Sequence, residues 1–226
     1  MFEAKLSKEE VNEMPTILFE GKITLVDELS KVAPAIEYLR KSPVVGIDTE
    51  TRPSFTRGVH YKISLVQIAN LEQCFLFRLN KIGFPKELAD FLADDSIKKV
   101  GLAVREDLAG LNRIKTFRPQ NVVEIQSIVN NYGILELGLQ KIFAILFGRK
   151  ISKSQRLTNW ESDVLNNMQQ KYAATDAWAT LLIYLQLINE QTISKKEIDA
   201  LKFLHNPMNH QQAIKGEEVK AESKDV

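Results

Sequence analysis

Proline is missing from a long central stretch of this chain, and that gap limits what the second half can fold into. The seven prolines leave an interval from Pro119 to Pro207 without one. Because proline breaks helix interiors, such an interval favours long helices. Gly and Pro punctuation is frequent before it, so the pattern predicts a β-rich first half and a helix-rich second half.

Short apolar runs bounded by turn residues predict the strands, and amphipathic runs predict the helices. The expected strands are 43–48, 63–69, 74–79, 97–101 and 121–125, with 63–69 and 74–79 paired across a turn at 70–73. The expected helices are 27–41, 85–94, 104–112, about 125–132, 135–147, 162–189 and 195–204. This order predicts an α/β fold with a mixed sheet.

Composition excludes several classes of protein. The 226 residues carry 30 Lys plus Arg against 29 Asp plus Glu, a formal charge of +1, which argues against a basic coat for nucleic acid. The single cysteine, Cys74, permits neither an internal disulfide nor a multi-cysteine zinc site, and favours a cytoplasmic location. Apolar runs stay well short of the roughly 18 residues of a membrane span, so we expect no membrane partner. The sequence has no glycine-rich phosphate loop, so we expect no nucleotide cofactor.

Two carboxylates end the first buried strand. Asp48 and Glu50 follow the apolar run 44–47, and alternation along a strand sends both side chains to one face. Ligand sites in α/β sheets gather beyond the carboxyl ends of strands. An isolated Asp-x-Glu is, however, also what a strand running into a polar turn looks like.

A third acid, Asp107, opens the helix that follows the strand ending at Gly101. An acid in the first turn of a helix suits the helix dipole, and that explanation competes evenly with a catalytic one.

Tyr172 and Asp176 stand four residues apart and share a helix face. Val164, Met168, Ala179, Ile183 and Leu187 place that face toward the core. A buried carboxylate is costly unless something compensates for its charge. Either Tyr172 and Asp176 satisfy each other and their neighbours by hydrogen bonds, or a cation shared with other carboxylates neutralises Asp176.

Taken together, the acids Asp48, Glu50, Asp107 and Asp176 supply the hard oxygen ligands that two Mg²⁺ or Mn²⁺ ions require. Two such ions about 4 Å apart can hold an attacking hydroxide and stabilise the leaving oxygen of a phosphodiester. Tyr172 would then orient the water. Its ordinary pKa of about 10 makes it a poor base, so deprotonation falls mainly to the metal.

Three segments resemble the three exonuclease motifs of the DEDDy-type 3′–5′ exonucleases of the ribonuclease-H-like superfamily. They are 45–50, 100–111 and 172–177, supported by 63–68 and 152–161. Within that superfamily the chain is most similar to the group of ribonuclease D and the Werner-syndrome exonuclease domain, over about residues 17–190.

The resemblance implies a ribonuclease-H-like mixed sheet of five or six strands flanked by helices, with the acidic site at one sheet edge. It implies that Asp48, Glu50, Asp107 and Asp176 bind the metals and that Tyr172 positions water. It also implies a 3′–5′ exonuclease that acts on nucleic acid with a free 3′ end, DNA or RNA, and releases nucleoside monophosphates. We expect an N-terminal extension at 1–16, the exonuclease domain at 17–205 and a disordered charged tail at 206–226.

Substrate contacts are predicted from basic and aromatic residues near the motifs. Residues 137–160 hold five cations and no acid, a composition that suits a phosphate-tracking groove or a solvated face: Lys141, Arg149, Lys150, Lys153 and Arg156. We select Lys153 and Arg156 for phosphate, and Gln67 and Trp160 for the terminal nucleotide, although Trp160 also suits core packing.

Two rival functions use the same residues. A nuclease-like module could bind nucleic acid or a protein without cutting, but it would have no reason to bear the mutual repulsion of four acids. The same site could also cut internally or hydrolyse small nucleotides.

Overall fold

The computed structural model describes residues 2–59 and 61–206, so most of the expected tail at 206–226 lies outside the described residues. The strands are β1 (Thr16–Ile17), β2 (Lys22–Val26), β3 (Val44–Thr51), β4 (Ile63–Ala69), β5 (Gln73–Arg78), β6 (Lys98–Gly101), β7 (Val122–Glu124) and β8 (Lys150–Ile151). The α-helices are α1 (Lys8–Glu13), α2 (Val32–Leu39), α3 (Leu79–Ile82), α4 (Lys86–Leu92), α5 (Val104–Ile114), α6 (Ile125–Ile128), α7 (Leu139–Phe147), α8 (Asn167–Leu187) and α9 (Lys195–Leu204). Two 3₁₀ helices are η1 (Leu29–Lys31) and η2 (Val129–Tyr132).

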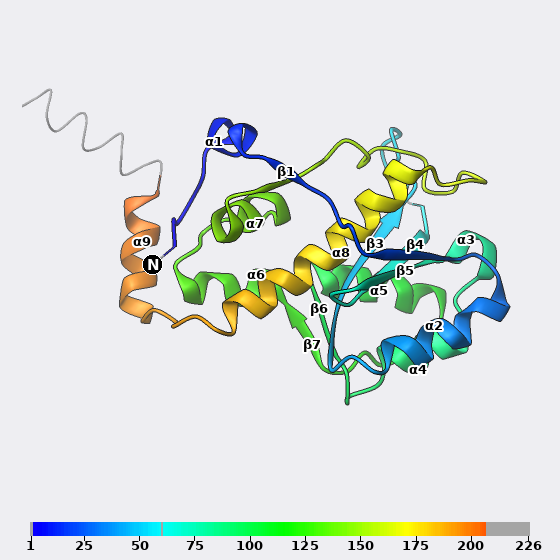
Figure 1. Cartoon of the computed structure of the whole chain (residues 1–226). Helices are drawn as coiled ribbons and strands as arrows, with labels where there is room; N and C mark the ends of the chain where they lie inside the picture. The colour runs from blue at the N-terminus through cyan, green and yellow to red at the C-terminus, as the bar shows by residue number, and fades with distance from the viewer. Residues whose placement is uncertain (1, 60, 207–226) are drawn as a thin grey trace, which may run out of the picture.

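Six strands form one mixed sheet in the order β2-β5-β4-β3-β6-β7, confirming the predicted α/β architecture (Figure 1). β3 pairs antiparallel with β4 and parallel with β6. β4 and β5 form the expected hairpin, whose turn is closed by backbone N–H groups of Glu72 and Gln73 donating to Asn70 Oδ1. Strand β2, which the sequence did not indicate clearly, extends the sheet by pairing with β5.

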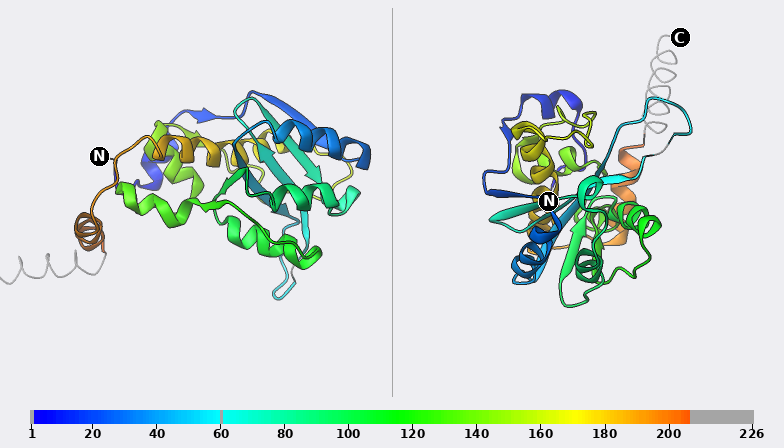
Figure 2. Two further views of the ribbon diagram at one scale, coloured as in Figure 1. Left: turned by 90° about the horizontal axis from the view of Figure 1, so that it is seen from below. Right: turned by 90° about the vertical axis from the view of Figure 1, so that its right-hand side faces the viewer.

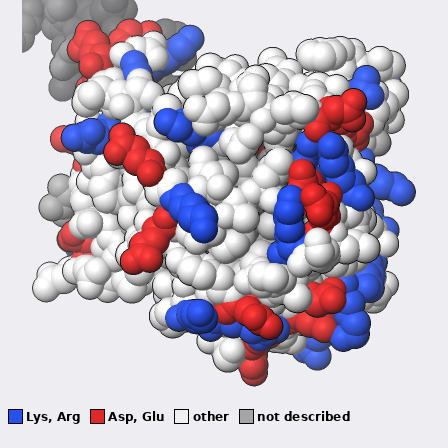
Figure 3. All heavy atoms as spheres, turned by 45° about the vertical axis from the view of Figure 1, so that its right-hand side comes forward, with Lys and Arg blue, Asp and Glu red and all other residues white. Residues whose placement is uncertain are grey.

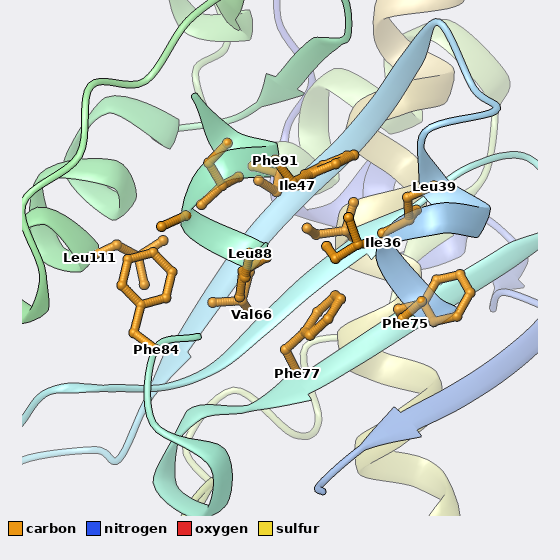
Figure 4. Close-up of a cluster of buried hydrophobic side chains, with 14 of the residues drawn as sticks. Ile36, Leu39, Ile47, Val66, Phe75, Phe77, Phe84, Leu88, Phe91 and Leu111 are labelled. Atoms are coloured by element: carbon orange, nitrogen blue, oxygen red, sulfur yellow. The ribbon is translucent and has the colours of Figure 1, made fainter. Parts of the chain in front are cut away.

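The sheet has a helix layer on each face (Figure 2). On one face α2, α4 and α5 cover a large apolar cluster, in which Ile36, Ile47, Phe77, Phe91 and Leu111 meet (Figure 4). On the other face the long helix α8 packs across β3 and β4. Strand alternation therefore divides β3, with Val45, Ile47 and Thr49 on the face of α2 and α5 and the intervening residues on the face of α8.

Helix α8 fulfils the expectation of a long helix in the proline-free interval, with 21 residues. It begins later than predicted, because Asn166 caps it through a reciprocal capping box with Gln169. The predicted core stripe is therefore wrong at its start. Val164 precedes the helix and is 79% exposed, and Met168 in the first turn is 46% exposed, whereas Ala179, Ile183 and Leu187 are buried.

The first 16 residues pack onto the rest of the protein. The Ala4 and Val11 side chains are buried, and β1 pairs in parallel with β8. Leu135 N–H also donates to the Ala4 carbonyl. The division of the chain at residue 16 remains a prediction, and this segment is in contact with the domain that follows it.

No helix within residues 2–59 and 61–206 is long and apolar enough to cross a membrane. On the face in Figure 3, acidic and basic side chains lie interspersed over the right-hand half. This arrangement agrees with the near-zero net charge and gives that face no broad field of one sign.

Candidate active site

Three carboxylates from two distant parts of the sequence meet beside the end of β3. Asp48 and Glu50 on β3 and Asp176 on α8 each place one oxygen within 4.8 Å of the others. Asp48 and Glu50 lie on an interior strand of the sheet, so the expectation of a site at the sheet edge is wrong in that detail. They lie instead near the carboxyl end of the strand, as its sequence predicted.

The close approach of α8 to β3 makes this meeting possible. A Cβ atom added to Gly46 would lie 1.9 Å from the carbonyl oxygen of Ala177 and 3.0 Å from the Leu181 Cβ. Only glycine leaves room for the helix backbone at this point. Asp176, the neighbour of Ala177, is thereby held against the strand that carries Asp48.

Asp107 reaches the same strand from the opposite face of the sheet. Its Oδ1 accepts a 2.6 Å hydrogen bond from the Thr49 hydroxyl, and its oxygens are not part of the three-carboxylate group. The pairing of β3 with β6 covers only Val44–Gly46, so the first turn of α5 can lie beside the last residues of β3. The structure thus brings the fourth predicted acid next to the cluster, held by its own partner.

Glu124 fixes the start of α5. Its carboxylate accepts from the backbone N–H groups of Ala103 at 2.8 Å and Arg105 at 3.4 Å. Ala103 has a left-handed conformation with φ of 59°, which turns the chain sharply out of β6 into the helix. Glu124 therefore positions Asp107 through the backbone.

Burial raises the pKa values of all four acids, and the charges of neighbouring carboxylates add to the rise for Asp48, Glu50 and Asp107. Burial is the main cause for each, and it raises the pKa of Glu50 to about 9, that of Asp176 to about 7 and that of Asp107 to about 6. The pKa of Asp48 rises well above its ordinary value, through burial first and then the charges of Asp176, Asp107 and Glu50. Without a cation the site therefore favours protonated carboxyls.

Tyr172 lies one helical turn before Asp176 and is 6% exposed. Hydrogen bonding to the Tyr172 hydroxyl lowers the pKa of Asp176, partly opposing the effect of burial. Burial and the neighbouring Asp176 and Glu50 charges raise the pKa of Tyr172 above its ordinary value. Its hydroxyl accordingly stays protonated at neutral pH and is available to donate a hydrogen bond.

The donor set fits a divalent cation of the magnesium type. The group consists of carboxylate oxygens only, which hard cations such as Mg²⁺ and Mn²⁺ prefer. A bound cation would also offset the repulsion that helps to raise the pKa values of Asp48 and Glu50. The residues present thus match the chemistry of the expected metal site.

Two of the residues predicted to bind substrate place a positive charge near the acids. Lys153 and Arg156 are exposed on the segment before α8. The charge of Arg156 lowers the pKa of Glu50, and that of Lys153 lowers the pKa of Asp176. Both cations therefore lie near the carboxylate cluster.

The structure contradicts direct substrate contact by Gln67 and Trp160, the other two residues predicted to bind substrate. Gln67 and Trp160 are both 0% exposed. Gln67 is buried because it faces α8 from β4, directly opposite Asp48 in the strand pairing. Trp160 packs on Tyr172 with ring centroids 5.9 Å apart, so its indole supports Tyr172 and is shielded from any nucleotide.

Sequence reasoning missed three residues that build the site: Gly46, Thr49 and the positioning role of Glu124. The Asp-Thr-Glu order did place Thr49 on the face opposite to the two acids. The sequence did not indicate that α5 brings Asp107 to that face.

A cavity of about 350 Å³ lies on the α5 face of the sheet, lined by Thr49, Asp107, Tyr61 and Arg113 among others.

Comparison with known proteins agrees with this geometry. Residues 23–191 match the family model described as 3′-5′ exonuclease. The chain is 31% identical over 186 residues to the bifunctional 3′-5′ exonuclease/ATP-dependent helicase WRN of Mus musculus, covering 78% of this chain and 13% of that protein. It is 30% identical over 195 residues to a 3′-5′ exonuclease of Arabidopsis thaliana, covering 79% of this chain and 68% of the relative.

A solved structure shows the same fold. The crystal structure of Escherichia coli RNase D aligns with a TM-score of 0.67 at 25% identity, over 85% of this chain and 48% of that one. The chain spans only part of these relatives, from 13% of the mouse protein to 68% of the plant protein. The family match over residues 23–191, the ribonuclease-H-like fold and the carboxylate cluster together establish that this chain belongs to the 3′-5′ exonuclease family.

Proposed function

We propose that this chain hydrolyses nucleic acid stepwise from a free 3′ end and releases nucleoside monophosphates, with two Mg²⁺ or Mn²⁺ ions held by Asp48, Glu50, Asp107 and Asp176. The observation that carries the proposal is the meeting of Asp48, Glu50 and Asp176 within 4.8 Å, with Asp107 of α5 hydrogen-bonded to Thr49 of the same strand. When bound, such ions activate water and stabilise charge on the leaving oxygen of a phosphodiester.

The chain's own residues divide the remaining tasks. Tyr172 stays protonated because its pKa is raised, so it serves as an orienting hydrogen-bond donor and is unsuited to be a general base. Trp160 packs against its ring and fixes its position. Lys153 and Arg156 bind substrate phosphates beside the acids. Their positive charge offsets the repulsion between the phosphates of the strand and the carboxylates of the site.

The substrate is a nucleic acid strand, and two observations support this choice. One crystal structure of similar fold is that of Trypanosoma brucei RNase D in complex with RNA U12, at 20% identity, and the bound RNA belongs to that protein. In this chain, the exposed cations beside the carboxylates favour a polyanion. The buried Cys74 agrees with a reducing compartment, and a cytoplasmic location remains our expectation.

A rival proposal is a nuclease-like module that binds without cutting. Burial raises the pKa values of all four acids, with added repulsion for Asp48, Glu50 and Asp107, and this destabilises the cation-free protein at neutral pH. A module that only binds gains nothing from that cost. Retention of the complete set therefore favours the enzyme.

The test is a gel assay with 5′-labelled single strands of DNA and of RNA, in Mg²⁺, in Mn²⁺ and in excess chelator. We expect a ladder of stepwise shortened products with either ion and intact strands in chelator. Full activity in chelator would exclude the metal mechanism. Cutting of a closed circular single strand at a comparable rate would show that no end is needed and would overturn the exonuclease assignment.

A further inference from the structure

A basic pocket of about 590 Å³ lies where the N-terminal segment meets β8 and the start of α7. Four lysines and one acid are among the residues that line it: Lys8, Lys141, Lys150, Lys153 and Glu136. The lysines come from α1, α7, β8 and the segment after β8. The pocket therefore exists only because residues distant in sequence are folded together.

The N-terminal wall of this pocket is fixed in place. Val11 is 2% exposed, and Lys150 N–H donates to the Pro15 carbonyl next to the β1–β8 pairing. Lys8, Asn12 and Thr16 of this segment line the pocket. They precede residue 23, where the match to the exonuclease family begins, so this wall belongs to this chain and not to the matched domain.

The charge of the pocket is positive after its internal pairing is counted. Glu136 is paired with Lys141 at 2.8 Å, which cancels one lysine. The Lys150 ammonium donates to the neutral Asn12 carbonyl and keeps its charge. The side chains of Lys8 and Lys153 are exposed, and their ammonium groups form no ion pair or hydrogen bond within the described part of the chain. Lysines without an ion-pair partner around a cavity fit a ligand with phosphate charges.

Lys153 connects this pocket to the carboxylate cluster. It lines the pocket and lies on the segment that leads from β8 to Trp160, whose ring packs on Tyr172 one helical turn before Asp176. Ser152 and Ser154, its neighbours, add hydroxyl donors to the pocket wall. A strand that ends at the acids can therefore continue past Lys153 into the pocket.

We propose that this pocket binds the phosphodiester backbone of the substrate strand on the 5′ side of the cleaved bond, and that the N-terminal segment contributes to substrate affinity through Lys8. The proposal rests on the proposed function, because it assigns the pocket to the same strand. It predicts that affinity grows with strand length up to the length that reaches Lys8.

The test compares Lys8→Gln with Lys196→Gln, a matched control on α9 that removes the same charge from an exposed lysine lining none of the described pockets. Binding is measured by fluorescence anisotropy in chelator, so that no strand is cut. The labelled single strands run from a dinucleotide to about 16 nucleotides, the upper range of site sizes for single-strand-binding folds.

For Lys8→Gln we expect weaker binding of the long strands and a salt dependence whose logarithmic slope falls by about one, the change expected for one phosphate contact. The loss should vanish for the dinucleotide, and Lys196→Gln should match the wild type throughout. Equal melting temperatures of the two variants would exclude unfolding as the cause.

Three outcomes would overturn the proposal: no change in Lys8→Gln at any length, an equal loss in Lys196→Gln, or a loss that is the same for the dinucleotide. A labelled glutamate peptide that binds with the same lysine dependence while nucleic acid does not would assign the pocket to an acidic protein. Because these readouts need no cleavage, they separate this proposal from the proposed enzymatic function.

Discussion

The hydroxyl of Thr49 donates a 2.6 Å hydrogen bond to Oδ1 of Asp107, and this contact joins strand β3 to helix α5 on the face of the sheet opposite α8. Thr49 stands between Asp48 and Glu50, whose carboxylates point to the other face. Three consecutive residues of β3 therefore place acids on both faces of the sheet. Asp48 and Glu50 are the acids on one face, and Thr49 holds Asp107 on the other. The hydrogen bond also lowers the pKa of Asp107 against the effect of burial.

Replacement of Thr49 by Val should weaken divalent cation binding, and more so at lower pH. Without the hydroxyl, the pKa of Asp107 rises above its value of about 6, so protons compete better with the cation. We expect the Kd for Mg²⁺ to rise by about tenfold near pH 6 and by less at pH 8, as for a loss of about one hydrogen bond to a charged group. Calorimetric titration at both pH values measures this change.

Thr51→Val is the matched control, because Thr51 lies two residues further on the same strand and is exposed. It should bind Mg²⁺ as the wild type does. An unchanged affinity in Thr49→Val at both pH values would show that Asp107 is positioned without Thr49.

Gly46→Ala should destabilise the protein and open the site. The new methyl group would lie 1.9 Å from the Ala177 carbonyl oxygen, so α8 must move away from β3. We expect a loss of about 1–3 kcal/mol or more in the free energy of unfolding, as for other overpacked cores. Chemical denaturation measures it, and Mg²⁺ binding should weaken in parallel because Asp176 moves with the helix.

The corresponding control is Gly138→Ala, since an added Cβ there has no atom within 4 Å and φ is −93°. This change at the N-cap of α7 should cost less than about 1 kcal/mol. Equal losses in the two variants would contradict the idea that Gly46 specifically permits the contact between α8 and β3.

Stability in chelator should fall as pH rises from about 4 to about 9. Folding raises the pKa of Asp107 from 3.8 to about 6, that of Asp176 from 3.8 to about 7 and that of Glu50 from 4.5 to about 9. The folded protein therefore binds more protons than the unfolded chain in this pH range. The free energy of unfolding decreases as pH rises, because the buried carboxyls must ionise in the folded state.

Divalent cations should reverse this trend, with the largest gain in melting temperature above pH 7, where Asp107, then Asp176 and finally Glu50 would otherwise carry like charges. Thermal melts in Mg²⁺ and in chelator across the pH range measure both effects. Asp176→Asn should flatten the decline in chelator. A stability that rises with pH in chelator would contradict the raised pKa values.

Tyr172→Phe separates catalysis from packing, because it removes only the hydroxyl. If Tyr172 orients the water, the rate should fall by about 10²-fold or more while Mg²⁺ binding stays nearly intact. If Tyr172 serves only to satisfy Asp176, the rate should survive and stability should fall by roughly 1 kcal/mol. Single-turnover cleavage together with thermal melting distinguishes the two.

Asp176→Asn is the comparison for this experiment, since it should weaken both metal binding and rate. We would abandon the catalytic role of Tyr172 if the Phe variant kept near-normal turnover on a substrate that Asp176→Asn could not cut.

The sequence alone determined the class of fold and most of the acidic site. Alternation along 44–50 put Asp48 and Glu50 on one face, and helical spacing put Tyr172 and Asp176 on one face, because both periods follow from local backbone geometry. The three motifs, in their order and spacing, also predicted the family.

Only the tertiary structure decided which faces meet and which side chains reach solvent. Packing of α8 on the sheet buries Gln67 of β4 and Trp160, which local patterns had suggested for substrate binding. The Thr49–Asp107 hydrogen bond and the basic pocket completed by Lys8 join residues separated by 58 positions or more. Local periodicity cannot report such contacts, because they depend on how whole elements pack against one another and not on the order of neighbouring residues.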